Sequence, residues 1–199
     1  DISKGDTIKD AFNSEYMENM RDEFLQGGQP ETCSKCWSLE EAGGTSKRMI
    51  SNEKFGINTD EKGITFLDLK LGNICNLKCR ICGGFSSSKW AAEEIKQGSD
   101  HAKGWLKAGM WPRKTDSLWN EVVHMLPNIE HFEFTGGEVT LWKDFIKCAQ
   151  YIKSKGHDIG FISNASRTIR WWEKNKNNFD HVCLSFHPES ADANHFLEV

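Results

Sequence analysis

Three cysteines close together in the chain are the residues best suited to hold an inorganic centre. Cys75, Cys79 and Cys82 fall within eight residues, in the pattern Cys-x3-Cys-x2-Cys. Short-spaced thiolates of this kind hold iron–sulfur clusters, whereas structural zinc usually takes four protein ligands. Three thiolates leave one metal position open, as a cluster that binds substrate requires. The alternatives are a chance group of buried cysteines and a zinc site completed from elsewhere in the chain.

The other cysteines are weaker candidates for a site. Cys33 and Cys36 have the spacing of half a metal site, and an iron–sulfur cluster, zinc or free thiols all remain open for this pair. Cys148 lies on the apolar stripe of an expected helix and is interpreted as a core residue. Cys183 lies on the polar side of an expected strand, where a structural role is favoured.

Strands and helices alternate from residue 64 onward. We expect strands at residues 64–71, 129–135, 159–163 and 181–186, and helices at 86–97, 115–125, 142–156 and 168–176. Residues 98–114 are expected to form an irregular loop. Because crossovers of this length join parallel strands, the pattern predicts an α/β fold with a parallel sheet.

The expected strands have one apolar and one polar side. Phe132 and Phe134 alternate with polar residues in the second strand, and the fourth strand alternates in the same way. Strands buried between two layers of helices are apolar on both sides. We therefore expect a curved sheet whose polar face lines a ligand cavity, with the site at the carboxyl ends of the strands. His131, His181 and His187 lie on the polar sides and could contact a substrate.

The N-terminal part of the chain is read as a separate segment. Apolar residues recur every four positions between residues 8 and 25, which predicts one continuous helix with Asp6 as its N-cap and Gly27-Gly28 at its end. The polar, glycine-rich stretch that follows is expected to be an extended arm or a small subdomain. The expected domains are therefore residues 1–62 and 63–199.

With these motifs in place, the sequence resembles the radical S-adenosylmethionine (radical SAM) enzymes. Cys75, Cys79 and Cys82 after the first core strand match the family's cysteine signature, and Gly136-Gly137-Glu138 after the second strand matches its Gly-Gly-Glu motif. The resemblance covers about residues 64–186. It implies a partial (β/α) barrel of which about four strand–helix units are present, preceded by a helical extension that carries cysteines.

The resemblance also implies a cofactor site. The three cysteines would ligate a [4Fe-4S] cluster, whose fourth iron would chelate the amino and carboxylate groups of S-adenosylmethionine. Glycine lacks a Cβ, so Gly136 and Gly137 would let the backbone approach the cofactor. The ammonium group would be held by Thr135, Gly137 and Glu138. The ribose or the carboxylate would be met by residues that follow or lie in the third and fourth strands, namely Ser163, Asn164 and Ser185.

An enzyme of this kind would cleave S-adenosylmethionine to a 5′-deoxyadenosyl radical, which would abstract hydrogen from an unidentified peptide or small molecule. This chemistry makes the chain an oxidoreductase and requires an electron donor such as flavodoxin or ferredoxin. Residues 29–37, with Cys33 and Cys36, resemble the cysteine pairs of Twitch and SPASM modules, which hold auxiliary clusters and usually follow the barrel.

Composition narrows the remaining choices. The net charge of −4 argues against nucleic-acid binding, and no apolar run reaches the ~20 residues that span a membrane. Seven cysteines without a signal peptide favour the reducing cytoplasm. The alternative functions are a non-catalytic zinc-binding module and a truncated, inactive barrel. Because the chain does not begin with Met, a fragment of a longer protein is one interpretation.

Overall fold

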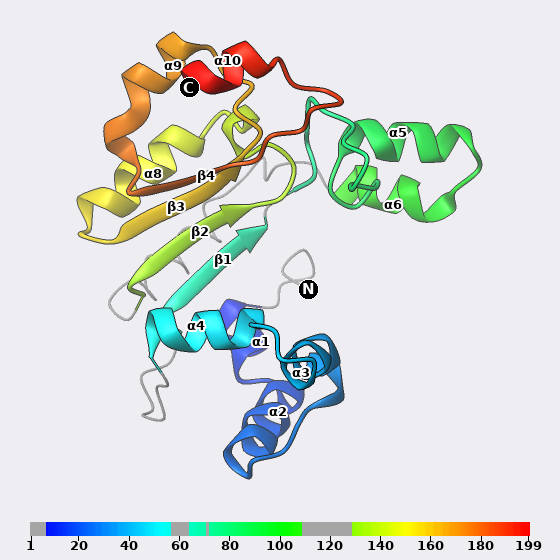
Figure 1. The fold of residues 1–199 in the computed structure, drawn as a ribbon, viewed down its shortest axis with the longest axis vertical. Coiled ribbons are helices and arrows are strands. Elements are labelled where there is room, and N and C mark those ends of the chain that lie inside the picture. Colours follow the sequence, from blue (N-terminus) through cyan, green and yellow to red (C-terminus); the bar gives the residue numbers. More distant parts are fainter. Residues whose placement is uncertain (1–6, 57–63, 71, 109–128) are drawn as a thin grey trace. The chain divides into compact units, whose positions relative to one another are not determined.

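The computed structural model describes residues 7–56, 64–70, 72–108 and 129–199 (Figure 1). These residues divide into two compact units. The first unit contains residues 7–56 and 64, and the second contains the rest of the described residues. Among the described residues, no helix has the length and apolar character needed to cross a bilayer.

A parallel sheet forms the centre of the second unit. Its strands lie side by side in chain order (Figure 1): β1 (Phe66–Lys70), β2 (His131–Thr135), β3 (Asp158–Ser163) and β4 (His181–Leu184). Every neighbouring pair is parallel, and the register places Leu67 beside Phe132 and Phe132 beside Ile159. The predicted α/β fold with a parallel sheet is confirmed.

Helices cover the apolar face of this sheet. They are α8 (Phe145–Ser154) and α9 (Ile169–Asn175), with short 3-10 turns η4 (Val139–Leu141) and η5 (Lys176–Asn178). Phe134 and Phe161 are buried to 1% exposure, and their rings lie 5.5 and 5.0 Å from that of Phe145 on α8. Each fully buried side chain of this size contributes about 1.5–3 kcal/mol, so this aromatic cluster is the core that holds the strand ends in place.

The other face of the sheet is polar, as the alternation predicts. His131, Glu133 and Thr135 point away from the phenylalanines of β2, and Asp158 and Gly160 lie on the same face of β3. The last helix, α10 (Ala193–Glu198), follows β4. Its His195 Nε2 lies 3.0 Å from the carbonyl oxygens of Ala165 and Arg167, in the loop after β3.

A helical hairpin follows β1. It consists of α5 (Ser88–Lys96) and α6 (Asp100–Ala108), and in Figure 1 it lies on the side toward which the strands point. The expected irregular loop at residues 98–114 is therefore wrong for residues 100–108. The Ser99 hydroxyl accepts a hydrogen bond from the Ala102 N–H at 3.3 Å, and Ala102 is fully buried, so a capped and packed helix forms despite Gly104.

The first unit is helical in its described residues. Its elements are α1 (Ile8–Phe12), α2 (Glu15–Leu25), η2 (Glu31–Cys33), α3 (Ser34–Glu41) and α4 (Lys47–Phe55). Of the two forms expected for the stretch after Gly28, an extended arm or a small subdomain, the extended arm is wrong, because η2, α3 and α4 occupy most of its described residues. The Ser46 hydroxyl caps α4 by accepting the Met49 N–H at 3.1 Å.

The single helix expected at residues 8–25 is also wrong, because the chain forms two. Asn13 ends α1, and extended backbone at Ser14 starts α2, with the Ser14 hydroxyl accepting the Met17 N–H. The Arg21 guanidinium holds the two helices together by donating to the Phe12 carbonyl at 2.8 Å. α1 is capped by Thr7. The expected cap Asp6 and the expected helix at residues 115–125 lie outside the described residues.

Candidate functional site

The loop that carries Cys75, Cys79 and Cys82 joins β1 to α5, and hydrogen bonds hold it against the start of that helix. The Ser87 hydroxyl donates to the Leu77 carbonyl at 2.7 Å, and the Trp90 indole N–H donates to the Cys79 carbonyl at 2.9 Å. These bonds satisfy loop carbonyls that a helix or strand would otherwise pair. The cysteine loop is therefore positioned by its own sequence neighbours, which explains why a short motif can specify it.

A cavity of about 280 Å³ opens at the carboxyl ends of the strands. All three cysteines of the motif line it, and so do residues from the ends of β1, β2 and β3 and from the segments that follow β2, β3 and β4. Of the twelve predicted site residues, all but Glu138 and the Cys33–Cys36 pair line this cavity; the nine are Cys75, Cys79, Cys82, Thr135, Gly136, Gly137, Ser163, Asn164 and Ser185.

The electrostatics of the thiols suit a cationic centre. Burial, and to a lesser degree the nearby Cys82, Cys75 and Glu189, raises the pKa of the Cys79 thiol to about 11. Burial is also the main reason that the pKa of Cys75 is raised. Without a cation the thiols of Cys75 and Cys79 hold their protons, whereas a metal centre stabilises the thiolate form that ligates it. The donor set therefore fits an iron–sulfur cluster.

Weak donors face the sulfur of Cys75. The Leu77 N–H lies 3.4 Å from this sulfur, and the Asn164 side-chain amide lies 3.9 Å from it. The same amide donates to the Asn76 side chain at 3.0 Å, which fixes its direction. Hydrogen bonds to ligand sulfurs adjust the reduction potential of iron–sulfur clusters. Asn164, which follows β3, is thus placed to act on a ligand that follows β1.

The two glycines after β2 pack directly against the segment that leads into the cysteine loop. Gly137 has a φ of +59°, and a Cβ on it would lie 2.3 Å from the Ile74 carbonyl oxygen. A Cβ on Gly136, whose φ is +86°, would lie 2.7 Å from the Gly72 carbonyl oxygen. Only glycine fits both the backbone conformation and the close approach. The Gly-Gly pair therefore brings the turn after β2 against the cysteine loop.

The family model of the radical SAM superfamily matches residues 69–192, which is more than half of the chain. The chain belongs to the radical SAM superfamily. A search of the curated proteins found no match. The matched residues run from the end of β1 to the segment before α10. They include every residue of the cavity wall, the three cysteines among them. Members of this superfamily typically bind a [4Fe-4S] cluster and S-adenosylmethionine, in agreement with the donor set.

Within this radical SAM core, the cofactor contact of Glu138 stays a prediction, and its carboxylate has partners in the protein. Its side chain is fully buried and accepts four hydrogen bonds from the protein. Oε1 accepts from the Thr140 N–H and hydroxyl at 3.3 and 2.6 Å and from the Ser163 hydroxyl at 2.9 Å. Oε2 accepts from the Asn164 N–H at 2.7 Å. The carboxylate is turned into the protein, where it joins the turn after β2 to the end of β3.

Two further residues of the cavity wall, Lys70 and His187, and Glu189 beside them are not predicted cofactor ligands, although His187 is expected to contact a substrate. Lys70, at the end of β1, places its ammonium 3.3 Å from the Ser86 hydroxyl and 3.7 Å from the Phe85 ring centroid, and burial lowers its pKa. His187 and Glu189 follow β4 and lie next to Cys79. Glu189 accepts the Arg80 N–H at 2.8 Å across 109 positions, a contact for which the sequence holds no local signal.

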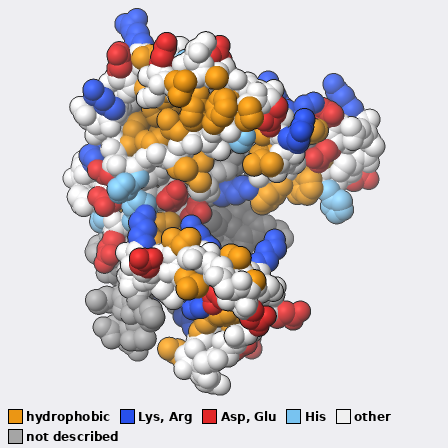
Figure 2. Space-filling view, viewed as in Figure 1, with side chains coloured by type: hydrophobic (Ala, Val, Ile, Leu, Met, Phe, Trp, Pro, Cys, Tyr) orange, Lys and Arg blue, Asp and Glu red, His pale blue; other side chains and the backbone are white. Residues whose placement is uncertain are grey.

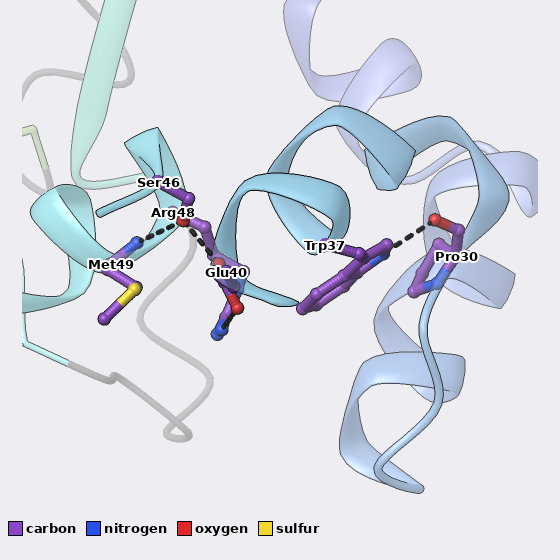
Figure 3. Close-up of polar contacts among 6 residues, drawn as sticks. All are labelled: Pro30, Trp37, Glu40, Ser46, Arg48 and Met49. Atoms are coloured by element: carbon purple, nitrogen blue, oxygen red, sulfur yellow. Dashed lines mark hydrogen bonds and ion pairs between the residues drawn. The ribbon is translucent and has the colours of Figure 1, made fainter. Parts of the chain in front are cut away.

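The second cysteine pair lies in the first unit. Cys33 ends η2 and Cys36 lies in the first turn of α3. Figure 3 shows the polar contacts around this helix: the Trp37 indole donates to the Pro30 carbonyl, and Arg48 pairs with Glu40. The hydrogen bond with Glu40 raises the pKa of Arg48, and Cys33 and Cys36 act in the same direction. The pair is thus next to a cation on α4. Cys183 is exposed, and Cys148 is half-buried.

Proposed function

We propose that this radical SAM chain is an enzyme that cleaves S-adenosylmethionine reductively and abstracts hydrogen from a peptide or small-molecule substrate. One observation carries the proposal: Cys75, Cys79 and Cys82 line a single cavity together with the Gly-Gly turn at the carboxyl ends of the strands. When bound, the reduced cluster and S-adenosylmethionine supply a 5′-deoxyadenosyl radical. The protein's own contribution is to bind, orient and enclose these groups.

The cavity wall contains the groups that such binding needs. Three thiols are available as ligands, and three protein ligands leave the open corner that a chelating cofactor requires. Thr135, Ser163 and Ser185 offer hydroxyls, while the Gly-Gly turn exposes backbone without side chains. Lys70 adds a cation beside the cavity, which suits a carboxylate group. We assign Glu138 a positioning role, because its carboxylate holds Ser163 and Asn164 in place.

Cys33 and Cys36 are proposed to serve a second, auxiliary iron–sulfur cluster of the Twitch or SPASM type. The pair supplies two of the ligands such a cluster takes, and it lies near the Arg48 guanidinium. Within the described residues the pair belongs to no group of three or more potential ligands, so further ligands must come from elsewhere. Flavodoxin or ferredoxin is the proposed electron donor.

Anaerobic reconstitution with iron and sulfide tests the cluster and its cofactor. We expect a brown protein whose EPR signal after dithionite reduction changes when S-adenosylmethionine is added, because the cofactor occupies the open corner. Cys82→Ala should lose this signal. Cys183→Ala, which removes an exposed cysteine outside the cavity wall, should keep it. A colourless protein that binds only zinc, or an EPR signal that S-adenosylmethionine leaves unchanged, would contradict the proposal.

A further inference from the structure

A second group of potential metal ligands lies on the polar face of the sheet, where three strands begin. His131 starts β2, Asp158 starts β3 and His181 starts β4. One ligand atom from each of these residues lies within 4.8 Å of the other two. In Figure 2, histidine and acidic side chains gather at the left of the view, the side on which these strands begin in Figure 1. Three adjacent strands therefore bring one donor each to the same point.

The strand register explains how these donors meet. His131 lies beside Asp158, and Gly160, two residues further along β3 and on the same face, lies beside His181. A Cβ on Gly160 would lie 3.3 Å from His131 Nε2 and 3.5 Å from His181 Cβ. Because Gly160 has no side chain, no Cβ from this position enters the space between the two histidines. The two imidazoles share this space, with ring centroids 5.7 Å apart.

His131 is held rigidly in this position. It is only 5% exposed, and its ring stacks on Phe66 with centroids 5.4 Å apart and an angle of 8° between the planes. Its Nε2 lies 3.4 Å from Glu133 Oε2, which brings a second carboxylate to the group. Asp158 and His181 are exposed, so their side chains can adjust. One fixed imidazole with two adjustable donors is suited to closing around an ion.

The chemistry of the donors selects the kind of ion. Two imidazoles and one or two carboxylates suit zinc and other divalent transition metals, whereas calcium and magnesium prefer oxygen ligands alone. Donors at 2.0–2.1 Å around a tetrahedral zinc lie about 3.3 Å apart. The present separations, up to 4.8 Å, require small side-chain rotations to reach that value.

This group is separate from the cavity that holds the motif cysteines. None of its members lines that cavity, and its donors sit at the opposite ends of the strands. β2 rises about 3.3 Å per residue from His131 to Thr135, so about 13 Å separates its two ends. We propose that His131, Asp158 and His181, with Glu133 beside them, form a metal site that takes Zn²⁺ and is separate from both cysteine groups. A zinc ion at this site links the starts of β2, β3 and β4. This proposal does not depend on the proposed function.

Zinc titration of the anaerobically reconstituted chain, against a chromophoric chelator, tests the site. The wild-type chain should take up one zinc equivalent more than His181→Ala. His101→Ala, which removes an exposed histidine on α6, should match the wild type. All three proteins keep the seven cysteines, so zinc bound by thiols cancels in the comparison even where cluster loading fails. Equal zinc uptake by the wild type and His181→Ala would overturn the proposal.

A second variant keeps the test decisive where His181→Ala does not fold. Gly160→Ala retains every donor but places a methyl group against His131 Nε2, and we expect its zinc affinity to fall about tenfold or more. X-ray absorption of the wild type with one added zinc should show nitrogen and oxygen neighbours at about 2.0–2.1 Å with imidazole scattering. Sulfur neighbours at about 2.3 Å, or unchanged affinity in Gly160→Ala, would instead indicate a hydrogen-bonded histidine–carboxylate group without a metal role.

Discussion

Gly137 is the residue at which one added methyl group is expected to do most damage. Gly137→Ala forces a Cβ against the Ile74 carbonyl oxygen, 2.3 Å away, and imposes a left-handed conformation on alanine. The conformation costs about 1–2 kcal/mol, and displacing packed backbone adds about 1–3 kcal/mol. We expect the free energy of unfolding, measured in urea, to fall by the sum of these two costs. The iron content after reconstitution should fall as well.

Gly98→Ala is the matched control for this prediction. Gly98 also has a positive φ, of +93°, but no atom lies within 4 Å of the position its Cβ would take. This variant should lose only the conformational part, about 1–2 kcal/mol. Equal stability of the two variants would show that the close approach to Ile74 is unimportant.

The buried carboxylate of Glu138 gives a second test at the residue scale. Glu138→Gln replaces a carboxylate that accepts four hydrogen bonds by an amide whose NH₂ group can accept none. Leaving buried donors unpaired costs about 1–3 kcal/mol. We expect the free energy of unfolding to fall by that amount in denaturant titrations. Glu173→Gln, on the exposed side of α9, should be unchanged, and a Glu138→Gln protein as stable as this control would refute the positioning role.

The sequence predicts the cavity's cysteines and glycines because their signal is local. Three thiols within eight residues and a Gly-Gly pair after a strand can be read without knowing the fold. The hydrogen bonds of Glu138 cannot be predicted in this way, since its partners Ser163 and Asn164 lie 25 and 26 positions away and no spacing rule connects them. The contact between Glu189 and Arg80 spans 109 positions and cannot be predicted from the sequence for the same reason.

At the scale of elements, the four strands are found within a few residues of their predicted positions. In β2 and β3 the apolar residues of the pattern include Phe134 and Phe161, which pack against Phe145 on α8, so pattern and packing agree there. The break between α1 and α2 was missed because the apolar stripe continues across it, while the capping hydroxyl of Ser14 starts a new helix. α6 was missed because Gly104 and Trp105 suggested a loop, whereas buried Ala102 packs it as a helix.

Asp180 links β3 to the segment before β4, and its charge makes this link sensitive to pH. Burial raises the pKa of Asp180, but hydrogen bonds from Lys153 and from the Ile159 N–H outweigh it and hold the pKa below its usual value. A lowered pKa in the folded protein stabilises it above the unfolded value of about 3.9, and this stabilisation is lost as the pH falls further.

Asp180→Asn should therefore be less stable than the wild type by about 1 kcal/mol at pH 7. The gap in the free energy of unfolding should narrow as the pH falls below about 4, because the wild-type carboxyl becomes neutral. Denaturant titrations of both proteins across this pH range measure the difference between their free energies of unfolding. The titration of other groups affects both proteins equally and cancels in this difference. A gap that is constant with pH would show that the charge of Asp180 is unimportant.

At the scale of the whole molecule, the two cysteine groups belong to different compact units. The core of the second unit contains Phe134, Phe145 and Phe161, whereas the Cys33–Cys36 pair lies in the first unit. Changing Cys33 and Cys36 together to alanine should therefore leave the cluster at the strand ends intact. After reconstitution, we expect the iron content to fall by the auxiliary share, from about eight to about four atoms per chain.

Iron and sulfide analysis of the double variant checks this expectation against a Cys148→Ala control, in which a helix cysteine outside both groups is changed. An unchanged iron content in the double variant would show that the pair holds no iron. Loss of all iron would show that the two groups do not act separately.

The three cysteines at the strand ends are proposed to support the cleavage of S-adenosylmethionine. The most direct measurement is the amount of 5′-deoxyadenosine formed after anaerobic reduction of the iron-loaded chain with S-adenosylmethionine. We predict that the wild type forms this product and that Cys79→Ala, which lacks one cavity thiol, forms none. A fully loaded wild type without product, or a Cys79→Ala variant that still forms it, would contradict this role of the cysteines.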